Sequence, residues 1–170
     1  MGKEELKSKI FSMSLKQKLY DEVLGILQEE KIIKFSESFV SLYDFNVKLN
    51  KEQERMKEKI LRAYEEGKYN PLKVNELEET EKDKKTFKMV YTMLLDNKEL
   101  SKISEEYIIL NKYYIEGKDK IVNFIKENGK LSTSQGRELL DTNRKYAVAF
   151  LEHMDNIKVT KRVENERILF

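Results

Sequence analysis

The residue types that carry most enzyme chemistry are scarce in this chain of 170 residues. It contains no Cys and one His, so it offers no thiolate zinc site, no cysteine nucleophile and no two-histidine metal motif. Its six glycines form no glycine-rich phosphate loop. The one histidine, His153, falls on an apolar helical stripe, which is typical of a core-edge ring with one satisfied nitrogen. We therefore expect that the chain is not an enzyme and holds no metal and no cofactor.

The chemistry that the sequence does offer lies in a short cationic run, Asp141–Tyr146. Thr142 or Asn143 can cap a helix there, and Arg144 and Lys145 then fall in its first turn. A first turn has unpaired backbone N–H groups and the positive end of the helix dipole, so two cations beside it favour a bound phosphate. The planar guanidinium of an arginine could instead contact a base edge or stack on an unpaired base. This run therefore predicts a contact with nucleic acid.

Polar side chains before and after this run extend the predicted interface. A short helix precedes it, and a two-stranded ribbon, the wing, follows it; on a winged helix we expect the helix start and the wing to face the same side, so that their cations converge. The candidate contact residues are Asn143, Arg144, Lys145, Lys161, Arg162, Arg167, Gln135 and Arg137. The alternative is a solvated surface, because Glu152, Asp155 and Glu166 are close enough to pair with several of these cations.

The elements that would position these side chains recur along the chain. Three segments share the pattern of two short alternating strands around a polar turn, with the turns at 36–38, 104–106 and 164–166. Each follows an amphipathic helix, and the apolar stripes of the three helices align without a gap. The aligned positions are Leu19, Val23, Ile26, Leu27 and Ile32; Phe87, Tyr91, Leu94, Leu95 and Leu100; and Tyr146, Phe150, His153, Met154 and Val159.

Further helices complete the repeat. A shorter amphipathic helix precedes each stripe, at 3–10, 74–79 and 133–140, and a longer one comes first in two copies, at 51–66 and 118–127. This order of elements is typical of the winged helix, a helix-turn-helix variant. We expect an α+β, mainly helical fold of tandem winged-helix repeats in an elongated array. The predicted units are 1–46, 47–112 and 113–170.

The first copy has no counterpart of the longer first helix. Its stripe around Leu19 and Val23 should therefore be exposed, and we expect the chain to be the C-terminal piece of a longer protein. The alternative is a two-helix unit that packs on the second copy as an extension.

Charge and hydropathy limit the class of protein. The 33 basic and 31 acidic residues nearly cancel, so a nucleic-acid site must be a local patch. No apolar run approaches the ~20 residues that span a bilayer, and the N-terminus is no signal peptide. The absence of Cys is typical of the reducing cytoplasm, which is the expected location, with no membrane contact.

The stretch 140–169 closely resembles the end of the bacterial selenocysteine-specific elongation factor family, SelB. The resemblance is carried by the helix start Asn143–Ala147, by the run Leu151–Asp155, and by Val159–Arg162 followed by Arg167–Leu169. Residues 2–9 resemble the start of the family's second C-terminal winged helix, although the family's usual proline after the glycine is absent. The middle copy matches by its place in the repeat rather than by a motif.

The resemblance implies a GTPase followed by four winged helices, of which this chain would be the last three, the first truncated. The last unit would bind the apical loop of the selenocysteine insertion element (SECIS), an mRNA hairpin beside an in-frame UGA codon. The GTPase end of the full-length protein would carry selenocysteinyl-tRNA to the ribosome, and no GTP or tRNA site falls in this sequence. By position, the family's hairpin contacts would be Asn143, Arg144, Lys145, Lys161, Arg162 and Arg167, with Gln135 and Arg137 beside them.

Two other classes of function remain open from the sequence. One is a DNA-binding winged-helix transcriptional regulator with the long helix in the major groove, and the other is a protein-interaction array. Only the last copy combines a basic helix start with few acidic neighbours, because the start at 84–86 follows the acidic stretch 76–83. This asymmetry favours one compact target bound by the last copy alone, with the first two copies as spacers.

Overall fold

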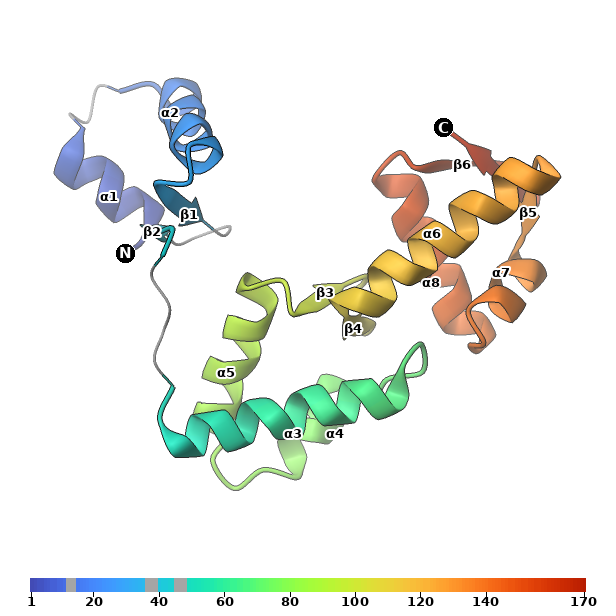
Figure 1. Cartoon of the computed structure of the whole chain (residues 1–170), viewed down its shortest axis with the longest axis horizontal. Coiled ribbons are helices and arrows are strands. Elements are labelled where there is room, and N and C mark those ends of the chain that lie inside the picture. The colour runs from blue at the N-terminus through green and yellow to red at the C-terminus, as the bar shows by residue number, and fades with distance from the viewer. Residues whose placement is uncertain (12–14, 36–39, 45–48) are drawn as a thin grey trace. The chain divides into compact units, whose positions relative to one another are not determined.

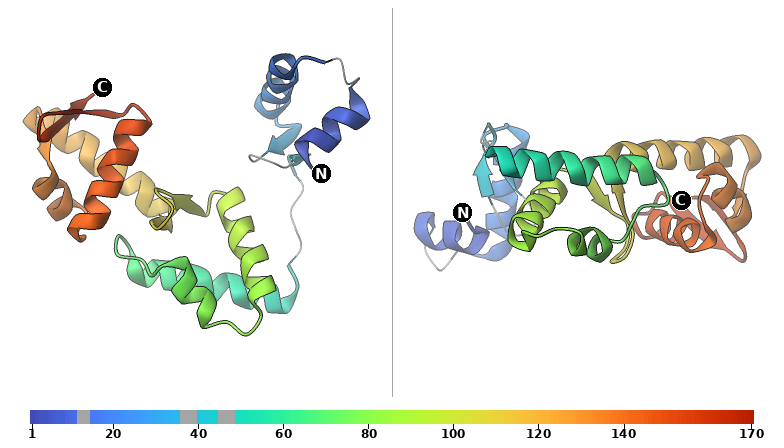
Figure 2. Two further views of the ribbon diagram at one scale, coloured as in Figure 1. Left: turned by 180° about the vertical axis from the view of Figure 1, so that it is seen from behind. Right: turned by 90° about the horizontal axis from the view of Figure 1, so that it is seen from below.

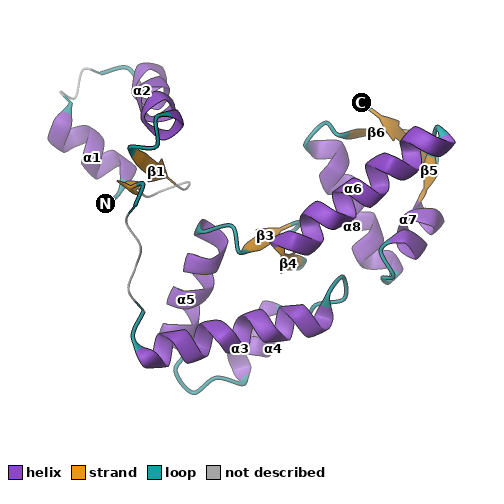
Figure 3. Cartoon of the chain, viewed as in Figure 1, coloured by secondary structure: helices purple, strands orange, loops and turns teal. Residues whose placement is uncertain are grey.

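The computed structural model describes residues 1–11, 15–35, 40–44 and 49–170, and the chain divides into two compact units, Met1–Lys48 and Leu49–Phe170. Helices dominate both units, and the strands form small antiparallel sheets (Figure 1, Figure 3). The expected α+β, mainly helical class with tandem winged-helix repeats is confirmed. Among the described residues, no helix has the length and apolarity needed to cross a bilayer.

The unit Met1–Lys48 has two helices and a hairpin. Its elements are α1 (Lys3–Ile10), α2 (Gln17–Glu29), β1 (Ile33–Phe35) and β2 (Val40–Leu42). A small core holds it together, consisting of Tyr20, Leu24, Ile33 and Val40. The polar turn predicted at 36–38 lies outside the described residues.

Two apolar side chains of α2 are exposed: Leu19 is 49% exposed and Ile26 is 55% exposed. α2 begins at Gln17 and α5 begins at Lys84, so the gapless alignment of the apolar stripes is wrong by one residue. The counterparts of the buried Phe87 and Leu94 are Tyr20, which is also buried, and Leu27, which packs on the same small core. The predicted exposure is confirmed at Leu19, whereas Val23 is half-buried.

The unit Leu49–Phe170 contains two successive winged-helix segments. The first, which we call the α3–β4 segment, consists of α3 (Lys51–Gly67), α4 (Val74–Glu79), α5 (Lys84–Asp96), β3 (Leu100–Lys102) and β4 (Ile108–Leu110). The second, the α6–β7 segment, consists of α6 (Asn111–Asn128), β5 (Leu131–Ser132), α7 (Thr133–Leu139), α8 (Arg144–Asn156), β6 (Thr160–Val163) and β7 (Glu166–Leu169). The sheet of the α6–β7 segment has the order β5-β7-β6.

Local sequence explains the helix boundaries. Asn50 caps α3, where its side chain and that of Gln53 each accept a hydrogen bond from the other's backbone N–H. α6 ends at Gly129, whose φ of 80° is the left-handed conformation that glycine adopts without strain, as the Asn128-Gly129 pair predicts. α6 begins at Asn111 rather than at 118 as the sequence predicted.

A close approach between helices explains the earlier start of α6. Gly117 is buried in α6, and a Cβ atom there would lie 2.9 Å from the Phe150 ring and 3.1 Å from Leu140. Glycine is therefore required by packing at this point and does not break the helix. Residues 111–117, which precede the helix predicted at 118–127, therefore belong to the same helix.

One continuous core joins the α3–β4 and α6–β7 segments. Tyr107, in the turn between β3 and β4, stacks on Tyr146 of α8 with the ring centroids 4.3 Å apart. Both rings are buried, and each large buried side chain contributes about 1.5–3 kcal/mol to stability. The start of α8 is thus packed against the α3–β4 segment.

Candidate nucleic-acid interface

The start of α8 is a capped first turn that carries two exposed cations. The Asn143 side chain accepts a hydrogen bond from the Tyr146 backbone N–H at 3.0 Å, which satisfies one of the helix's orphan donors. Arg144 and Lys145 follow and are exposed. The neutral cap leaves the positive end of the helix dipole uncompensated, so the predicted anion-favouring helix start is present.

The two cations differ in what they contact. Among the described residues, none forms a hydrogen bond or ion pair with the Arg144 guanidinium. Lys145 forms an ion pair with Glu106, which raises the pKa of Lys145 and lowers that of Glu106 through a side-chain hydrogen bond and the opposite charge. The Lys73 ammonium lies 4.0 Å from the same carboxylate. Arg144 is therefore the cation of this turn that is free to bind a ligand.

The wing carries the second group of candidate residues. Lys161 and Arg162 lie on β6 and are exposed, and the Arg162 Nε donates a hydrogen bond to the Glu164 carbonyl at 2.9 Å. Lys161 has no hydrogen bond or ion pair to any described residue. Both side chains carry a positive charge and are exposed, so they can contact phosphates, but their arrangement indicates no particular ligand.

Arg167 is buried, which corrects the prediction that it belongs to the exposed surface. It is 2% exposed, and its Nε lies 3.3 Å from an Asp155 carboxylate oxygen. Its NH1 donates to the Thr133 hydroxyl at 3.0 Å, and the Thr160 hydroxyl donates to Asp155 at 2.5 Å. The physical reason is its place on β7, where it faces α7 and α8 and joins the wing to them. The pairing with Asp155 that the sequence left as an alternative is the one observed.

The two candidate residues of α7 lie toward opposite ends of that helix. The Gln135 side chain accepts hydrogen bonds from the Ser132 N–H and hydroxyl, both at 2.8 Å, and so completes a capping box next to the wing sheet. The Arg137 carbonyl accepts from the Thr142 N–H at 3.2 Å, which places Arg137 beside the loop that leads into α8. The Arg137 side chain lies 3.7 Å from Glu138.

The helix start and the wing do not converge. β6 begins after the last turn of α8, and α8 has 13 residues, so its ends are about 20 Å apart. Figures 1 and 2 show the α7–α8 loop at the opposite end of α8 from β6. The predicted contact residues other than Arg167 therefore form two groups: Asn143, Arg144, Lys145 and Arg137 at the helix start, and Lys161, Arg162 and Gln135 near the wing.

Sequence reasoning missed one residue at the helix start. Asn70, in the loop between α3 and α4, accepts a hydrogen bond from the Asn143 N–H at 3.2 Å. The available signal was its position before Pro71, the chain's one proline, since an Asn-Pro pair marks a turn. That signal identifies a turn and says nothing of a contact with a residue so distant in the sequence.

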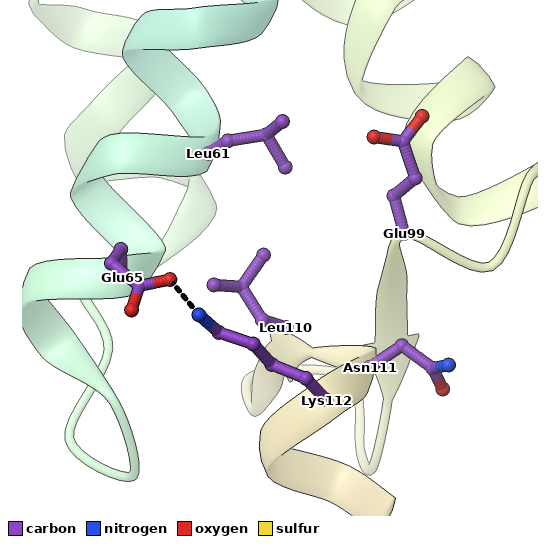
Figure 4. Close-up of a pocket in the computed structure, with 6 residues that line it drawn as sticks. All are labelled: Leu61, Glu65, Glu99, Leu110, Asn111 and Lys112. Atoms are coloured by element: carbon purple, nitrogen blue, oxygen red, sulfur yellow. Dashed lines mark ion pairs between the residues drawn. The ribbon is translucent and has the colours of Figure 1, made fainter.

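A cleft between α3 and the start of α6 offers no competing site. Leu61 and Leu110 form its apolar floor, and at its rim the Lys112 ammonium pairs with Glu65 at 2.5 Å (Figure 4). Glu99, also at the rim, pairs with Lys57 at 2.7 Å. The charged groups are thus paired within the fold.

His153 is a partly buried ring at the edge of the core, as the sequence predicted. Its Nε2 lies 3.3 Å from the Tyr114 hydroxyl, and burial lowers its pKa. Among the described residues, no three His, Cys, Asp or Glu side chains are grouped so that they could hold a metal ion.

Comparisons with known proteins converge on one family. Two family models with the description "Elongation factor SelB, winged helix" match residues 1–42 and 123–169. A selenocysteine-specific elongation factor of Desulfomicrobium baculatum is 28% identical over 91 residues, which are 54% of this chain and 14% of that protein. The chain thus spans about a seventh of the length of this relative.

Two solved structures share the fold. The mRNA-binding domain of elongation factor SelB from E. coli, in complex with SECIS RNA, superposes with a TM-score of 0.57 and 23% identity over 71% of this chain and 98% of that chain. A bacterial selenocysteine-specific elongation factor, EF-Sec, superposes with a TM-score of 0.56 and 21% identity over 100% of this chain and 26% of that chain. With SelB winged-helix models matching both its first residues and its last winged helix, the chain belongs to the winged-helix region of the SelB elongation factor family.

Proposed function

We propose that the chain binds the SECIS hairpin of an mRNA through its last winged helix, and that the start of α8 makes the principal contact. The hairpin's apical loop presents unpaired bases and closely spaced phosphates, the two groups that a planar guanidinium at a helix N-terminus can bind. Asn143 and Lys145 flank Arg144 in this contact, and Arg137 lies beside it.

One observation carries the proposal. Arg144 is an exposed arginine with no partner among the described residues, placed at a capped helix start inside the segment that a SelB winged-helix model matches. The fold shared with a SelB domain bound to SECIS RNA supports the choice of RNA over other anions.

The wing has a lesser role in this proposal. Because β6 lies about a helix length from the α8 start, Lys161 and Arg162 would contact phosphates of the hairpin stem rather than its loop. Each such contact would release counterions and steepen the dependence of affinity on salt.

The remaining functions of the factor lie elsewhere in the full-length protein. GTP hydrolysis, selenocysteinyl-tRNA binding and ribosome contact would belong to its other domains, while the described residues supply hydrogen bonds and charges and need no cofactor. The chain itself would catalyse no reaction. Binding to mRNA during translation places this activity in the cytoplasm.

A titration tests the proposal. At physiological salt we expect the chain to bind a SECIS hairpin at least tenfold more tightly than duplex DNA of equal length. Arg144→Ala should weaken hairpin binding by about 1–3 kcal/mol. The matched control is Arg62→Ala, which removes an exposed arginine of α3 whose partner, within the described part of the chain, is Glu66 of the same helix. Equal affinity for hairpin and duplex would instead favour the DNA-binding alternative.

A further inference from the structure

A three-residue loop of the α3–β4 segment holds the loop that leads into α8. We call this loop, Tyr69-Asn70-Pro71, the clamp. The Thr142 hydroxyl donates to the Tyr69 carbonyl at 2.8 Å. The Tyr146 hydroxyl, one turn into α8, donates to the Pro71 carbonyl at 3.2 Å. Backbone groups on both sides of Asn70 are therefore fixed to the two sides of the α8 start.

The Asn70 side chain uses both ends of its amide in this contact. Its Nδ2 donates to the Asp141 carbonyl at 2.9 Å. Its Oδ1 accepts from the Asn143 backbone N–H at 3.2 Å and lies 3.0 Å from the Thr142 hydroxyl, whose single proton the Tyr69 carbonyl and this oxygen share. Asp141 has a φ of 46°, a left-handed conformation that costs a non-glycine residue free energy and persists only where neighbours hold it.

Asn70 also orients the cap of α8. The Asn143 Nδ2 donates to the Asn70 Oδ1 at 3.4 Å, which leaves the Asn143 Oδ1 to accept from the Tyr146 N–H. With the amide reversed, the Asn143 NH₂ group would face the Tyr146 N–H and two donors would oppose each other. The clamp therefore fixes the residue that immediately precedes Arg144.

We propose that Asn70 is a positioning residue for RNA recognition. The α3–β4 segment is then part of the RNA-binding site rather than a spacer. This inference rests on the proposed function, because it assigns to Asn70 the task of holding Arg144 in the position that contacts the hairpin. A side chain that contacts a ligand is effective only when the residues around it lock its direction. This proposal differs from the sequence-based expectation that the last copy binds alone.

The first test is Asn70→Ala in the full chain. We expect hairpin affinity to fall about five- to tenfold, the effect of losing a small hydrogen-bond network, with the melting temperature within a few degrees of the unmodified chain. The matched control is Asn75→Ala, at an exposed asparagine of α4 that makes no hydrogen bond to a described residue; it should bind as the unmodified chain does. If Asn70→Ala does not fold, Asn70→Ser takes its place, since serine is too short to span the same groups.

A double-mutant cycle separates positioning from a general structural role. If Asn70 acts through Arg144, Asn70→Ala should cost less than twofold in an Arg144→Ala background but its full five- to tenfold in a Lys161→Ala background. Unchanged affinity in Asn70→Ala, or the same cost in all backgrounds, would overturn the inference.

Hydrogen exchange of the Asn143 amide in the free chain provides an RNA-independent measurement. We expect Asn70→Ala to speed this exchange at least tenfold, because the amide loses its acceptor. Unchanged exchange in Asn70→Ala would overturn the role of the clamp, even if this variant no longer bound RNA. If exchange became faster in Asn70→Ala but the unmodified chain did not prefer the hairpin to duplex DNA, the proposed function would be overturned instead.

Discussion

Helices α5 and α8 occupy the same place in successive winged-helix segments, yet their first turns differ in charge. Each has two basic residues after its cap, Lys84 and Lys85 in one and Arg144 and Lys145 in the other. The cap of α5 is Asp83, whose carboxylate accepts from the Thr86 N–H at 3.0 Å. Hydrogen bonds from Thr86 hold the pKa of Asp83 below its usual value, so the cap is a full anion.

The charge of the cap decides which helix start can bind an anionic ligand. At α5 the carboxylate compensates the helix dipole, and Glu78 of α4 pairs with Lys88 one turn further on. At α8 the cap is neutral, the clamp orients it, and Arg144 has no partner among the described residues. The same backbone element thus serves packing in one segment and carries the candidate RNA contact in the next.

The largest expected effect concerns the buried side chains that attach the β3–β4 and β6–β7 hairpins to the helices of their segments. In the repeat alignment, Arg167 takes the place of the buried Ile108 of the α3–β4 segment. Arg167→Ala should lower the free energy of unfolding by about 3 kcal/mol, because it leaves Asp155 largely buried without its partner. Denaturant unfolding measures this.

A compensating variant sharpens this prediction. Arg167→Ile with Asp155→Leu should recover most of the stability, since apolar packing replaces the pair as it does in the α3–β4 segment. Arg162→Ala, on the same hairpin but exposed, should change stability by less than 0.5 kcal/mol. A loss in Arg167→Ala no larger than that of Arg162→Ala would contradict the structural role.

Exchanging the caps tests the comparison of helix starts directly. Asn143→Asp should preserve the helix, because Asp and Asn cap equally well, but weaken hairpin binding by about 1 kcal/mol, since it adds a negative charge and removes the NH₂ donor to the Asn70 Oδ1. The reciprocal Asp83→Asn should leave hairpin affinity unchanged. Fluorescence titration of both variants at one salt concentration gives the result, and equal effects would remove the distinction between the two starts.

Removing the carboxylate beside Lys145 should have a smaller effect in the opposite direction. Glu106→Gln frees Lys145 and Lys73, so hairpin affinity should rise about two- to threefold and become more sensitive to salt. Glu105→Gln is the matched control, since Glu105 pairs with Lys102 on its own hairpin. Weaker binding in Glu106→Gln would mean that this ion pair helps to form the site.

The smallest expected effect is a pH dependence of stability that arises from His153 on α8. His153 takes the place of the half-buried Met93 of α5, and burial lowers the pKa of His153 below its usual value. The unfolded chain therefore binds the proton more readily, and this part of the stability is present above pH 6.5 and falls as the pH drops below it. Thermal melts of the unmodified chain and of His153→Leu between pH 7.5 and 5.5 should diverge with acid, and parallel curves would exclude the effect.

Sequence patterns predicted the local elements well, because short-range periodicity and caps determine them. The helices at 3–10 and 74–79 have the predicted bounds, and the Ser132 cap of α7 is observed. Tyr113, Tyr114 and Ile115 indicated a nearly continuous helix into the third copy, although its apolar positions were assigned from 118 on, after Gly117. Local pattern could not show that Arg167 faces inward, since its partners lie on other elements.

The candidate site was predicted in part. Exposed Arg144 and its capped turn follow from a few neighbouring residues, but the separation of α8's start from the wing depends on the three-dimensional path of the chain. Asn70 lies more than 70 residues from Asn143, and a contact of that range leaves no periodic trace in a single sequence.

The most direct test of the central claim is a comparison of Arg144→Ala with Lys84→Ala in one hairpin titration at physiological salt. Each variant removes the basic residue that follows the helix cap, in α8 and in α5 respectively. The account predicts a loss of about five- to 150-fold for Arg144→Ala and no measurable loss for Lys84→Ala. Equal losses, or no loss at Arg144, would contradict the assignment of RNA binding to the start of α8.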